Sequence, residues 1–406
     1  KKNYIGLYCV GHEAFITQKD LADGKCADHG VAPEKIEEEN YFFRLSRFET
    51  ELIALISSGR MRVFPDSRKN EMLAFLKNGL EDVSFSRPSK DISWGIPVPG
   101  DATQTMYVWC DALSNYITAL GFGSDDLKKF KEFWPADLHN IGKDILRFHA
   151  IIWPAVLLSV GLPVPKGIFV HGFINVGGQK MSKSIGNVID PLDFIKRHGR
   201  DALRYYLLRE ISTFEDADFT EGRFVEVYNA DLANGLGNYI SRVAKMVEQY
   251  FDGVLVRPST EELTAVPIKK RSSFFAPGDE GTKMELISPP YLIDRIVWPA
   301  YRCAFENYQL KQVLDIVWTL LGELDAYVQI YEPFKLVKTD PKKTKAVLWN
   351  LSYGVLSLGW MLKPFLPDTA DKILNAFGAG SNSKEEWKEI RVKLDGPLFT
   401  RKENVN

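Results

Sequence analysis

The phrase Ile168-Phe169-Val170-His171-Gly172-Phe173-Ile174-Asn175-Val176 decides the fold class of this chain of 406 residues. The run is rich in β-forming residues, and it follows a stretch from Tyr107 onwards that reads as helix, short strand and helix. Strands that alternate with helices are typical of an α/β layer. We therefore predict an α/β portion over residues 105–192, and we expect the chemistry of the protein to lie there.

The segments before this layer have a different pattern. A Cys/His-containing segment runs to about Gly30, and helical patterns occupy residues 41–80. Together they predict a small insert domain over residues 1–104. The opening phrase Tyr4-Ile5-Gly6-Leu7-Tyr8-Cys9 is typical of a strand, and because the chain has no initiator Met we expect it to be a fragment.

Beyond Glu221 the chain reads as long amphipathic helices. One of them should end at Gly253, and its apolar residues follow helical spacing: Ile240, Val243, Val247 and Tyr250. We predict an all-α helical bundle over residues 223–406. The run from Val256 to Pro290 interrupts it, because Pro, Ser, Gly and charged residues at that length predict an insertion or a loop without regular structure.

Composition excludes several classes of protein. The charged and apolar fractions are those of a globular protein, and a formal net charge of −2 gives no support to a uniformly basic nucleic-acid binder. Four scattered cysteines favour a reducing compartment over a disulfide-rich secreted fold, so we expect a cytoplasmic location, with an organelle matrix as the alternative. No apolar run of membrane-spanning length occurs.

The most informative motif is Lys180-Met181-Ser182-Lys183-Ser184, which follows a predicted hairpin turn at Gly177-Gly178. Mobile ammonium groups flanking a small loop suit attack on the α-phosphate of ATP, because they neutralise the charge that grows on the departing pyrophosphate. Two lysines in a loop without further motif context are more often simply solvated. The five-residue string is far more specific than such a pair.

At these residues the sequence resembles the class I aminoacyl-tRNA synthetases, and the methionyl group among them. Three further phrases carry the resemblance: Tyr107-Val108-Trp109-Cys110-Asp111-Ala112-Leu113, Gly142-Lys143-Asp144-Ile145-Leu146-Arg147-Phe148-His149 and Asn229-Ala230-Asp231-Leu232-Ala233-Asn234. The resemblance implies a Rossmann-like nucleotide-binding fold for residues 105–192, a stem-contact region over 193–222 and an anticodon-binding bundle. It also implies a methionine–tRNA ligase, which forms methionyl-adenylate from methionine and ATP with Mg²⁺ and transfers methionine to the 3′ end of tRNA(Met).

A helix face in the first phrase is the candidate methionine pocket. Its aromatic and apolar residues recur at helical spacing: Trp109, Ala112, Leu113 and Tyr116. Such a stripe is usually core packing, but the resemblance implies that this face lines the methionine side chain, with Phe148 and His149 closing the pocket. An unbranched thioether suits an aromatic box. The chain has Leu113 where the family commonly has Pro.

The candidate ATP site begins at Asp144, which follows Gly142 at an expected strand-to-helix turn, where nucleotides often dock in open α/β sheets. Its carboxylate could accept the ribose hydroxyls, or it could be a helix N-cap. The resemblance favours ribose binding, with Gly142 giving the backbone room and Ile174 against the adenine. It assigns Lys180 and Lys183 to charge stabilisation, and Lys183 also to ATP binding.

Near the start of the chain, Cys9-x-x-His12 and Cys26-x-x-His29 form two paired ligand sets that could close a tetrahedral zinc site. The family's knuckles are richer in cysteine, and some members have lost the metal. Two alternatives therefore remain: one structural zinc ion, or a knuckle that folds without metal.

In the helical half, Asn234, Asn238 and Arg242 step by four residues and should share one helix face. Solvation is the usual reason for a polar face. The resemblance instead assigns Asn238 and Arg242 to reading the first anticodon base, with Asn234 in support. Phe334, in the phrase Pro333-Phe334, stands where the family usually has a stacking Trp.

The family's His-x-Gly-His signature does not occur in the sequence. We therefore expect a C-terminal portion of the enzyme, and a separate N-terminal fragment as a partner beside methionine, ATP and tRNA(Met). A non-catalytic tRNA-binding fragment is the alternative. A ligase for another large apolar amino acid is less favoured, because no editing domain fits between Asp101 and Asp190.

Overall fold

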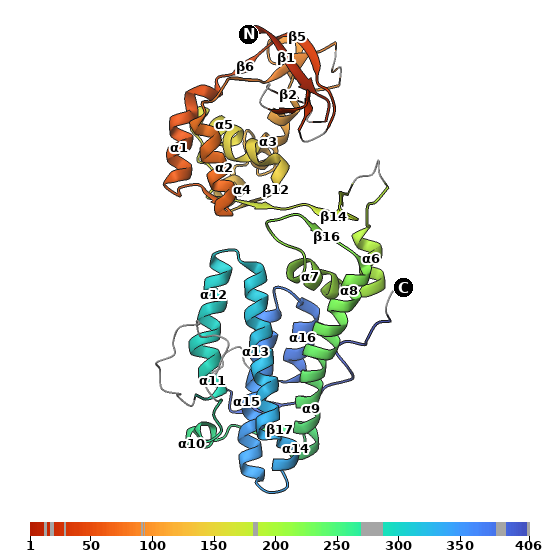
Figure 1. Cartoon of the computed structure of the whole chain (residues 1–406). Coiled ribbons are helices and arrows are strands. Elements are labelled where there is room, and N and C mark those ends of the chain that lie inside the picture. Colours follow the sequence, from red (N-terminus) through yellow and green to blue (C-terminus); the bar gives the residue numbers. More distant parts are fainter. Residues whose placement is uncertain are drawn as a thin grey trace. The chain divides into compact units, whose positions relative to one another are not determined.

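The computed structural model describes residues 1–11, 14–16, 20–27, 30–90, 92, 94–181, 186–268, 287–378 and 387–403. Within it the chain forms two compact units, Lys1–His171 and Gly172–Asn406. The first is a mixed α/β unit and the second is mainly helical (Figure 1). The predicted fold class is confirmed. Among the described residues no helix combines the length and the apolar character needed to cross a membrane.

A parallel sheet organises the first unit. β13 (Gly167–His171) is its central strand, with β12 (His139–Gly142) on one side and β7 (Arg62–Phe64) on the other. The continuous apolar run Ile168-Phe169-Val170 is buried, as expected for a parallel strand covered on both faces. The helices α1 (Glu49–Ser57), α2 (Asp66–Lys77) and α5 (Trp153–Ser159) supply apolar residues to the same core.

The position of β7 differs from the sequence-based expectation. We assigned residues 41–80 to the insert domain, whereas Val63 pairs with Ile168 in the parallel sheet. A strand of three residues between two helices carries too little periodicity to show which sheet it joins. Its place is set by pairing with a strand far along the chain.

The rest of the first unit consists of short antiparallel sheets and helices. The predicted opening strand is confirmed as β1 (Lys2–Cys9), which pairs with β2 (Ala14–Ile16) and β5 (Glu34–Asn40). The smaller strands are β3 (Leu21–Ala22), β4 (Lys25–Cys26), β6 (Phe42–Phe43), β8 (Val83–Ser84), β9 (Ser86–Pro88), β10 (Pro97–Val98) and β11 (Asp101–Met106). The remaining helices are η2 (Leu45–Phe48), α3 (Val108–Thr118), α4 (Lys128–Phe133), η3 (Lys143–Ile145) and η4 (Phe148–Ile152).

The second unit opens with a small sheet and two helices. β14 (Ile174–Val176) pairs with β15 (Gln179–Lys180) and, in parallel, with β16 (Ala217–Asp218). The helices α6 (Pro191–His198) and α7 (Arg200–Arg209) lie between β15 and β16 in the chain. The predicted hairpin is confirmed, because Gly177 and Gly178 turn it with positive φ angles.

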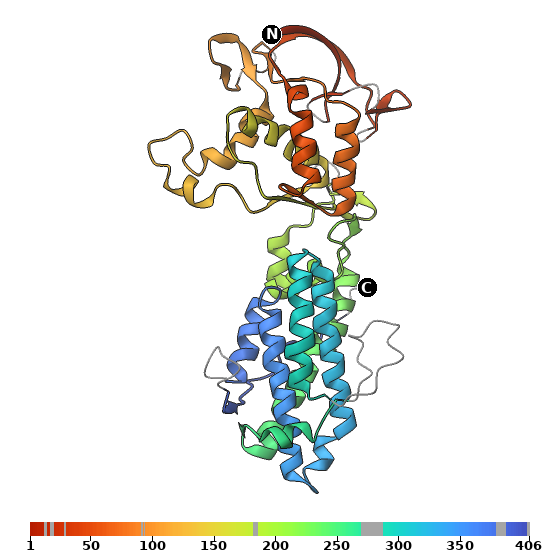
Figure 2. The same cartoon turned by 90° about the vertical axis from the view of Figure 1, so that its left-hand side faces the viewer.

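A helical bundle makes up the rest of this unit, as predicted. α8 (Glu221–Val227), the π-helical segment η5 (Tyr228–Gly237) and α9 (Asn238–Phe251) follow one another without a break. Asp252 adopts the left-handed conformation and Gly253 follows, so the predicted helix end is confirmed. Figure 2 shows the helices side by side. The others are η6 (Ile293–Val297), α10 (Thr260–Thr264), α11 (Pro289–Leu292), α12 (Trp298–Glu306), α13 (Leu310–Tyr331), α14 (Pro333–Leu336), α15 (Pro341–Leu362) and α16 (Pro367–Ala376).

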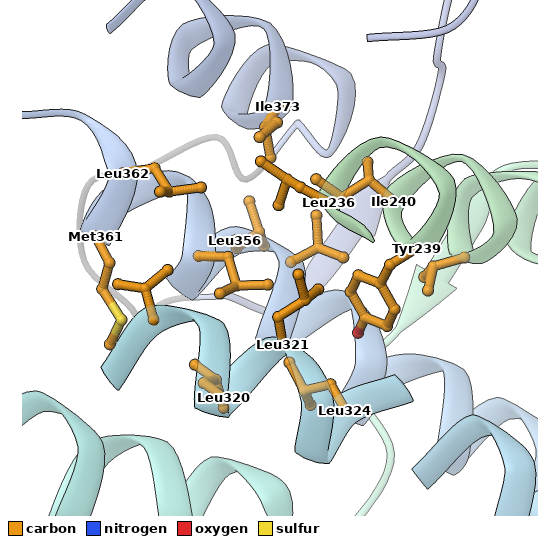
Figure 3. Packing of buried hydrophobic residues seen from close by; sticks show 14 of the residues in the cluster. Leu236, Tyr239, Ile240, Leu320, Leu321, Leu324, Leu356, Met361, Leu362 and Ile373 are labelled. Carbon is orange, nitrogen blue, oxygen red and sulfur yellow. The ribbon is translucent and has the colours of Figure 1, made fainter. Parts of the chain in front are cut away.

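The core of the bundle surrounds α15, which is buried on nearly every side. Figure 3 shows how Leu236, Tyr239 and Ile240 meet leucines of α13 and α15. Gly354 lets α15 approach α13, since a Cβ at that position would lie 2.5 Å from Leu324 Cδ1. The close contact therefore depends on a residue without a side chain.

Part of the expected Val256–Pro290 insertion has regular structure. Val256 ends β17 (Val254–Val256), which pairs with β18 (Glu389–Arg391), and α10 begins after a capping box in which Ser259 and Glu262 bond each other's backbone N–H. The Ser-x-x-Glu spacing is a sequence signal for this helix start, which we did not predict. Residues 269–286 lie outside the described residues.

The last described residues run back along η5. Lys402 N–H donates to Asn229 Oδ1 (2.8 Å), and Asn229 Nδ2 donates to the Lys402 carbonyl (2.9 Å). Tyr228 Oη donates to the Thr400 carbonyl at 3.1 Å, and the rings of Tyr228 and Phe399 meet edge to face.

Candidate functional site

The aromatic residues predicted for the methionine pocket come together in the first unit. Trp109 on α3 stacks on Phe148 of η4, with ring centroids 3.8 Å apart and planes 10° apart. Tyr116 lies two turns further along α3, and His149 follows Phe148. The rings of Trp109 and His149 are nearly perpendicular, with centroids 6.2 Å apart. Helical spacing on α3 and adjacency on η4 thus build one aromatic cluster from two elements.

A hydrogen bond joins Tyr116 to His149, and the surroundings of the His149 ring determine which of the two groups donates. His149 Nδ1 lies 2.9 Å from the Ile145 carbonyl, which can only accept, so Nδ1 carries the ring hydrogen. Burial lowers the pKa of His149, so the ring is neutral at pH 7 and Nε2 is an acceptor. The Tyr116 hydroxyl, 2.9 Å from Nε2, must therefore donate. Its lone pairs remain able to accept.

His139, at the start of β12, forms the far wall of the cluster. Its ring meets Tyr116 edge to face with centroids 4.1 Å apart, and the side chain is 5% exposed. Burial and the neighbouring His149 lower the pKa of His139 to about 4. A neutral imidazole therefore backs Tyr116 at physiological pH. Among the described residues no hydrogen-bond partner reaches His139 Nε2.

The two remaining residues predicted for the pocket lie differently. Leu113 is buried with Trp134, Trp153 and Leu157, on the side of α3 that faces the core. Ala112 is exposed on the same helix. On α3, Trp109 and Tyr116 are therefore the predicted pocket residues that are partly exposed and also contact other aromatic rings.

The residues predicted for ATP lie in both units. Gly142 ends β12 opposite His171 at the end of β13, so the carboxyl ends of the two parallel strands share one edge. Asp144 is exposed in the 3₁₀ turn that follows. Gly142 occupies the N-cap position of this turn, so the capping alternative for Asp144 is wrong. Ile174 lies on β14, in the second unit.

The lysine loop begins at the hairpin β14–β15. Lys180 is exposed at its end, with Nζ 4.0 Å from the centroid of the Phe173 ring. Two carboxylates hold the backbone of this hairpin: Asp218 accepts from Gly178 N–H at 2.9 Å, and Asp216 accepts from Phe173 N–H at 2.9 Å. Lys183, the other catalytic candidate, lies outside the described residues.

The predicted zinc ligands are described only in part. Cys9 and Cys26 are buried in one small apolar cluster with Ile16. They come from β1 and β4. His12 and His29 lie outside the described residues. No group of three metal-binding side chains occurs in the part of the chain that the structure describes.

The predicted anticodon residues lie on the second unit. Asn238 begins α9 and is exposed, as is Asn234 within η5. Arg242 is half-buried, and one of its terminal nitrogens donates to Asp325 Oδ1 on α13. Phe334 is 41% exposed on α14, the short helix after α13.

Comparisons with known proteins agree with these features. Residues 2–244 match the family described as tRNA synthetases class I (M). A methionine–tRNA ligase from Caldanaerobacter subterraneus is 40% identical over 97% of this chain and 58% of its own length, and one from Thermotoga maritima is 40% identical over 95% and 58%. A solved Mycobacterium tuberculosis methionyl-tRNA synthetase bound by methionyl-adenylate is 32% identical, with a TM-score of 0.82, over 98% of this chain and 77% of that one.

This chain belongs to the class I methionyl-tRNA synthetase family. The resemblance drawn from the lysine loop and its companion phrases is therefore confirmed. The chain spans less than two thirds of the length of the curated methionyl-tRNA synthetases that it matches.

Three features of this methionyl-tRNA synthetase chain were not predicted from sequence. His139 gave no signal because a lone histidine before a glycine turn is not distinctive, and its contact with Tyr116 depends on the packing of β12 against α3. Asp218 and Asp216 lie in the phrase Glu215-Asp216-Ala217-Asp218, which reads as a solvated acidic run. Asp325 contacts Arg242 across 83 residues of chain.

Proposed function

We propose that the protein to which this chain belongs is a methionine–tRNA ligase. It forms methionyl-adenylate and pyrophosphate from methionine and ATP, and then transfers methionine to the 3′ end of tRNA(Met). The observation that carries the proposal is the Trp109–Phe148 stack with its hydrogen-bonded Tyr116–His149 pair, in the same unit as the strand edge at Gly142. The methionyl-adenylate in the related Mycobacterium structure supports the same chemistry.

The aromatic cluster suits a methionine side chain. An unbranched thioether makes favourable contacts with ring edges and faces, and Trp109 and Phe148 offer both. The neutral His149 and the donating Tyr116 leave no charge beside an apolar substrate. A charged imidazole there would have to be desolvated when methionine binds, which costs binding free energy. We therefore assign side-chain recognition to Trp109, Tyr116, Phe148 and His149, with Ala112 and Leu113 supporting the helix.

ATP binding is assigned to the strand edge and to the lysine loop. Asp144 is exposed beside Gly142, and a carboxylate there suits the ribose hydroxyls. Lys180 and Lys183 would neutralise the leaving pyrophosphate, and Mg²⁺ would share that charge. Asp218 and Asp216 accept hydrogen bonds from the backbone of the hairpin before this loop and so help to position it. Ile174 on this hairpin is assigned to the adenine.

Methionine-dependent ATP–pyrophosphate exchange in the complete enzyme tests this assignment. Lys183→Ala should slow exchange by about 10²–10³, the usual effect of losing one transition-state donor, while the affinity for methionine stays near normal. Lys166→Ala is the matched control, because Lys166 pairs with Asp137 on the surface at 2.6 Å. An unchanged exchange rate in Lys183→Ala would remove the lysine loop from the mechanism. Absence of exchange in the complete enzyme itself would favour a non-catalytic tRNA-binding protein.

The second unit is proposed to read the first anticodon base. Asn238 and Arg242 lie one helical turn apart on α9 and offer amide and guanidinium groups, and the exposed Phe334 ring offers a stacking face. Arg242→Ala should weaken binding of a methionine-anticodon hairpin by roughly tenfold to a hundredfold, taking base contacts in DNA as the scale. Exchange should remain nearly unchanged. Equal losses of exchange and binding would make the role of Arg242 structural.

A structural zinc ion is proposed for the knuckle. The two buried thiols of Cys9 and Cys26 fit half of a tetrahedral donor set, and His12 and His29 would supply the rest. Zinc would serve folding of the knuckle rather than the reaction. Metal analysis of protein purified without chelators should find about one zinc per chain. A metal-free preparation with an intact fold would mean that packing alone holds the knuckle.

A further inference from the structure

The helices η5–α9 and α13 run side by side in the same direction in the second unit. A Cβ on Gly235 would lie 3.9 Å from Leu321 Cδ2, and further along both helices Arg242 contacts Asp325. Figure 3 shows Tyr239 and Ile240 on the core side, together with Leu321 and Leu324 of α13. Asp325 follows the fully buried Leu324, so it lies at the rim of the core, beside the residues proposed to read the anticodon.

The ion pair between Arg242 and Asp325 leaves hydrogen-bonding capacity on both sides. Asp325 uses Oδ1 for Arg242, and among the described residues no partner binds Oδ2. A carboxylate can accept several hydrogen bonds, and this side chain is 46% exposed. On Arg242, only one terminal nitrogen has a described hydrogen-bond partner, which leaves the other terminal nitrogen as a donor. A donor and an acceptor therefore lie side by side.

We propose that Asp325 is a specificity-determining residue that accepts a hydrogen bond from the 4-amino group of cytosine while it holds Arg242 in position. The inference rests on the proposed reading of the anticodon by this unit. Cytosine presents an amino donor where uracil presents an oxygen acceptor, so a carboxylate favours the first and repels the second. The methionine anticodon CAU begins with cytosine, and the isoleucine anticodon UAU differs from it in this base alone.

A simple interhelical ion pair is the competing explanation. Another ion pair reaches α13 from a different helix: Arg209 of α7 donates to Asp315 of α13, and it also lies 3.8 Å from Asp231 of η5. Exposed ion pairs contribute little to stability. Asp315 is 50% exposed, close to the value for Asp325, and both are acidic residues of α13 paired with an arginine. Asp315 is therefore a matched control without a proposed base contact.

The experiment compares two RNA hairpins that differ only in the loop sequence CAU or UAU. Their binding to the 406-residue chain is measured at one fixed ionic strength by fluorescence anisotropy, because phosphate contacts make affinities depend on salt. The unaltered chain should prefer CAU. Asp325→Asn, which keeps the size but presents an amide that can also donate, should reduce the CAU:UAU preference by roughly fivefold or more. Asp315→Asn should leave the preference unchanged, and Asp325→Glu should retain its direction.

The outcomes separate this inference from the function on which it rests. If Arg242→Ala weakens CAU binding while Asp325→Asn keeps the full preference, anticodon reading stands and the role of Asp325 is refuted. If Asp325→Asn and Asp315→Asn lower affinity for both hairpins equally, the Asp325 pair is structural and the inference is refuted. If neither Arg242→Ala nor Phe334→Ala affects binding, the proposed anticodon function itself fails.

Discussion

Replacing Tyr116 by Phe isolates the hydrogen bond that orders the aromatic cluster. The change removes the hydroxyl that donates to His149 Nε2 at 2.9 Å and leaves the ring. His149 is 2% exposed, so water has little access to the nitrogen that loses its donor. A buried acceptor left without a partner costs about 1–3 kcal/mol. For a unit of this size each kcal/mol shifts Tm by about 2–4 °C, so we expect a decrease of about 2–12 °C.

Differential scanning calorimetry measures the shift, with hydrogen exchange at α3 and η4 assigning the transition to the first unit. Tyr41→Phe is the control in the same unit. The Tyr41 hydroxyl donates to Asp101 at 3.1 Å, but Asp101 keeps its bonds to Lys1 and Thr103, so its loss should cost little. The reasoning is refuted if Tyr116→Phe lowers Tm no more than Tyr41→Phe does.

Three further changes follow from the same geometry. Burial and a neighbouring imidazole lower the pKa of His139 from 6.5 to about 4, so the stability that the neutral ring contributes is present above pH 6.5 and is lost as the pH falls towards 4. His139→Phe should therefore flatten the decline of Tm over that pH range, as measured by thermal unfolding. Gly354→Ala should destabilise by about 1–3 kcal/mol in chemical denaturation, since the new Cβ would meet Leu324. Gly322→Ala should stabilise by about 0.5–1 kcal/mol, because no described side chain or distant backbone atom lies within 4 Å of the new Cβ; equal effects would contradict the packing argument. Asp218→Asn should slow pyrophosphate exchange in the complete enzyme without changing methionine affinity, because it weakens the bond to the hairpin turn, and an unaltered rate would show that the turn holds without it.

Local periodicity explains which parts of the fold were predictable. The spacing of Trp109 and Tyr116 predicted a helix with an aromatic face, and α3 has both. The pair Gly177-Gly178 predicted a tight hairpin, and both glycines have the required positive φ. In each case the residues that set the conformation lie within a few positions of one another, so the sequence carries the whole signal.

Features that depend on distant contacts were not predictable. β7 is too short to show a period, and its pairing with β13 follows from the fold of the whole unit. His139 contacts Tyr116 only because β12 packs beside α3. The acidic residue that holds Arg242 lies on another helix, and nothing in its local sequence distinguishes it from a solvated side chain. Tertiary packing decides these contacts, and a single sequence does not encode them as a pattern.

The candidate site divides in the same way. Motif spacing identified the aromatic residues, and their mutual contacts agree with that selection. Protonation states required the structure, because the tautomer of His149 follows from the carbonyl that faces its Nδ1. Whether Asp144 caps the turn was also decided only by the backbone geometry, which places Gly142 at the N-cap position.

The segment after β18 has a practical consequence for anyone who trims or tags this protein. It looks dispensable, since its described residues, 392–403, form no helix or strand. Yet its backbone exchanges two hydrogen bonds with Asn229, and the rings of Phe399 and Tyr228 meet edge to face. A stop codon placed after Lys393 would uncover an aromatic surface and a buried amide on the helix that leads to the anticodon residues. Such a shortened protein should be more prone to proteolysis and aggregation, so an affinity handle is better appended beyond Glu403 than substituted for this segment.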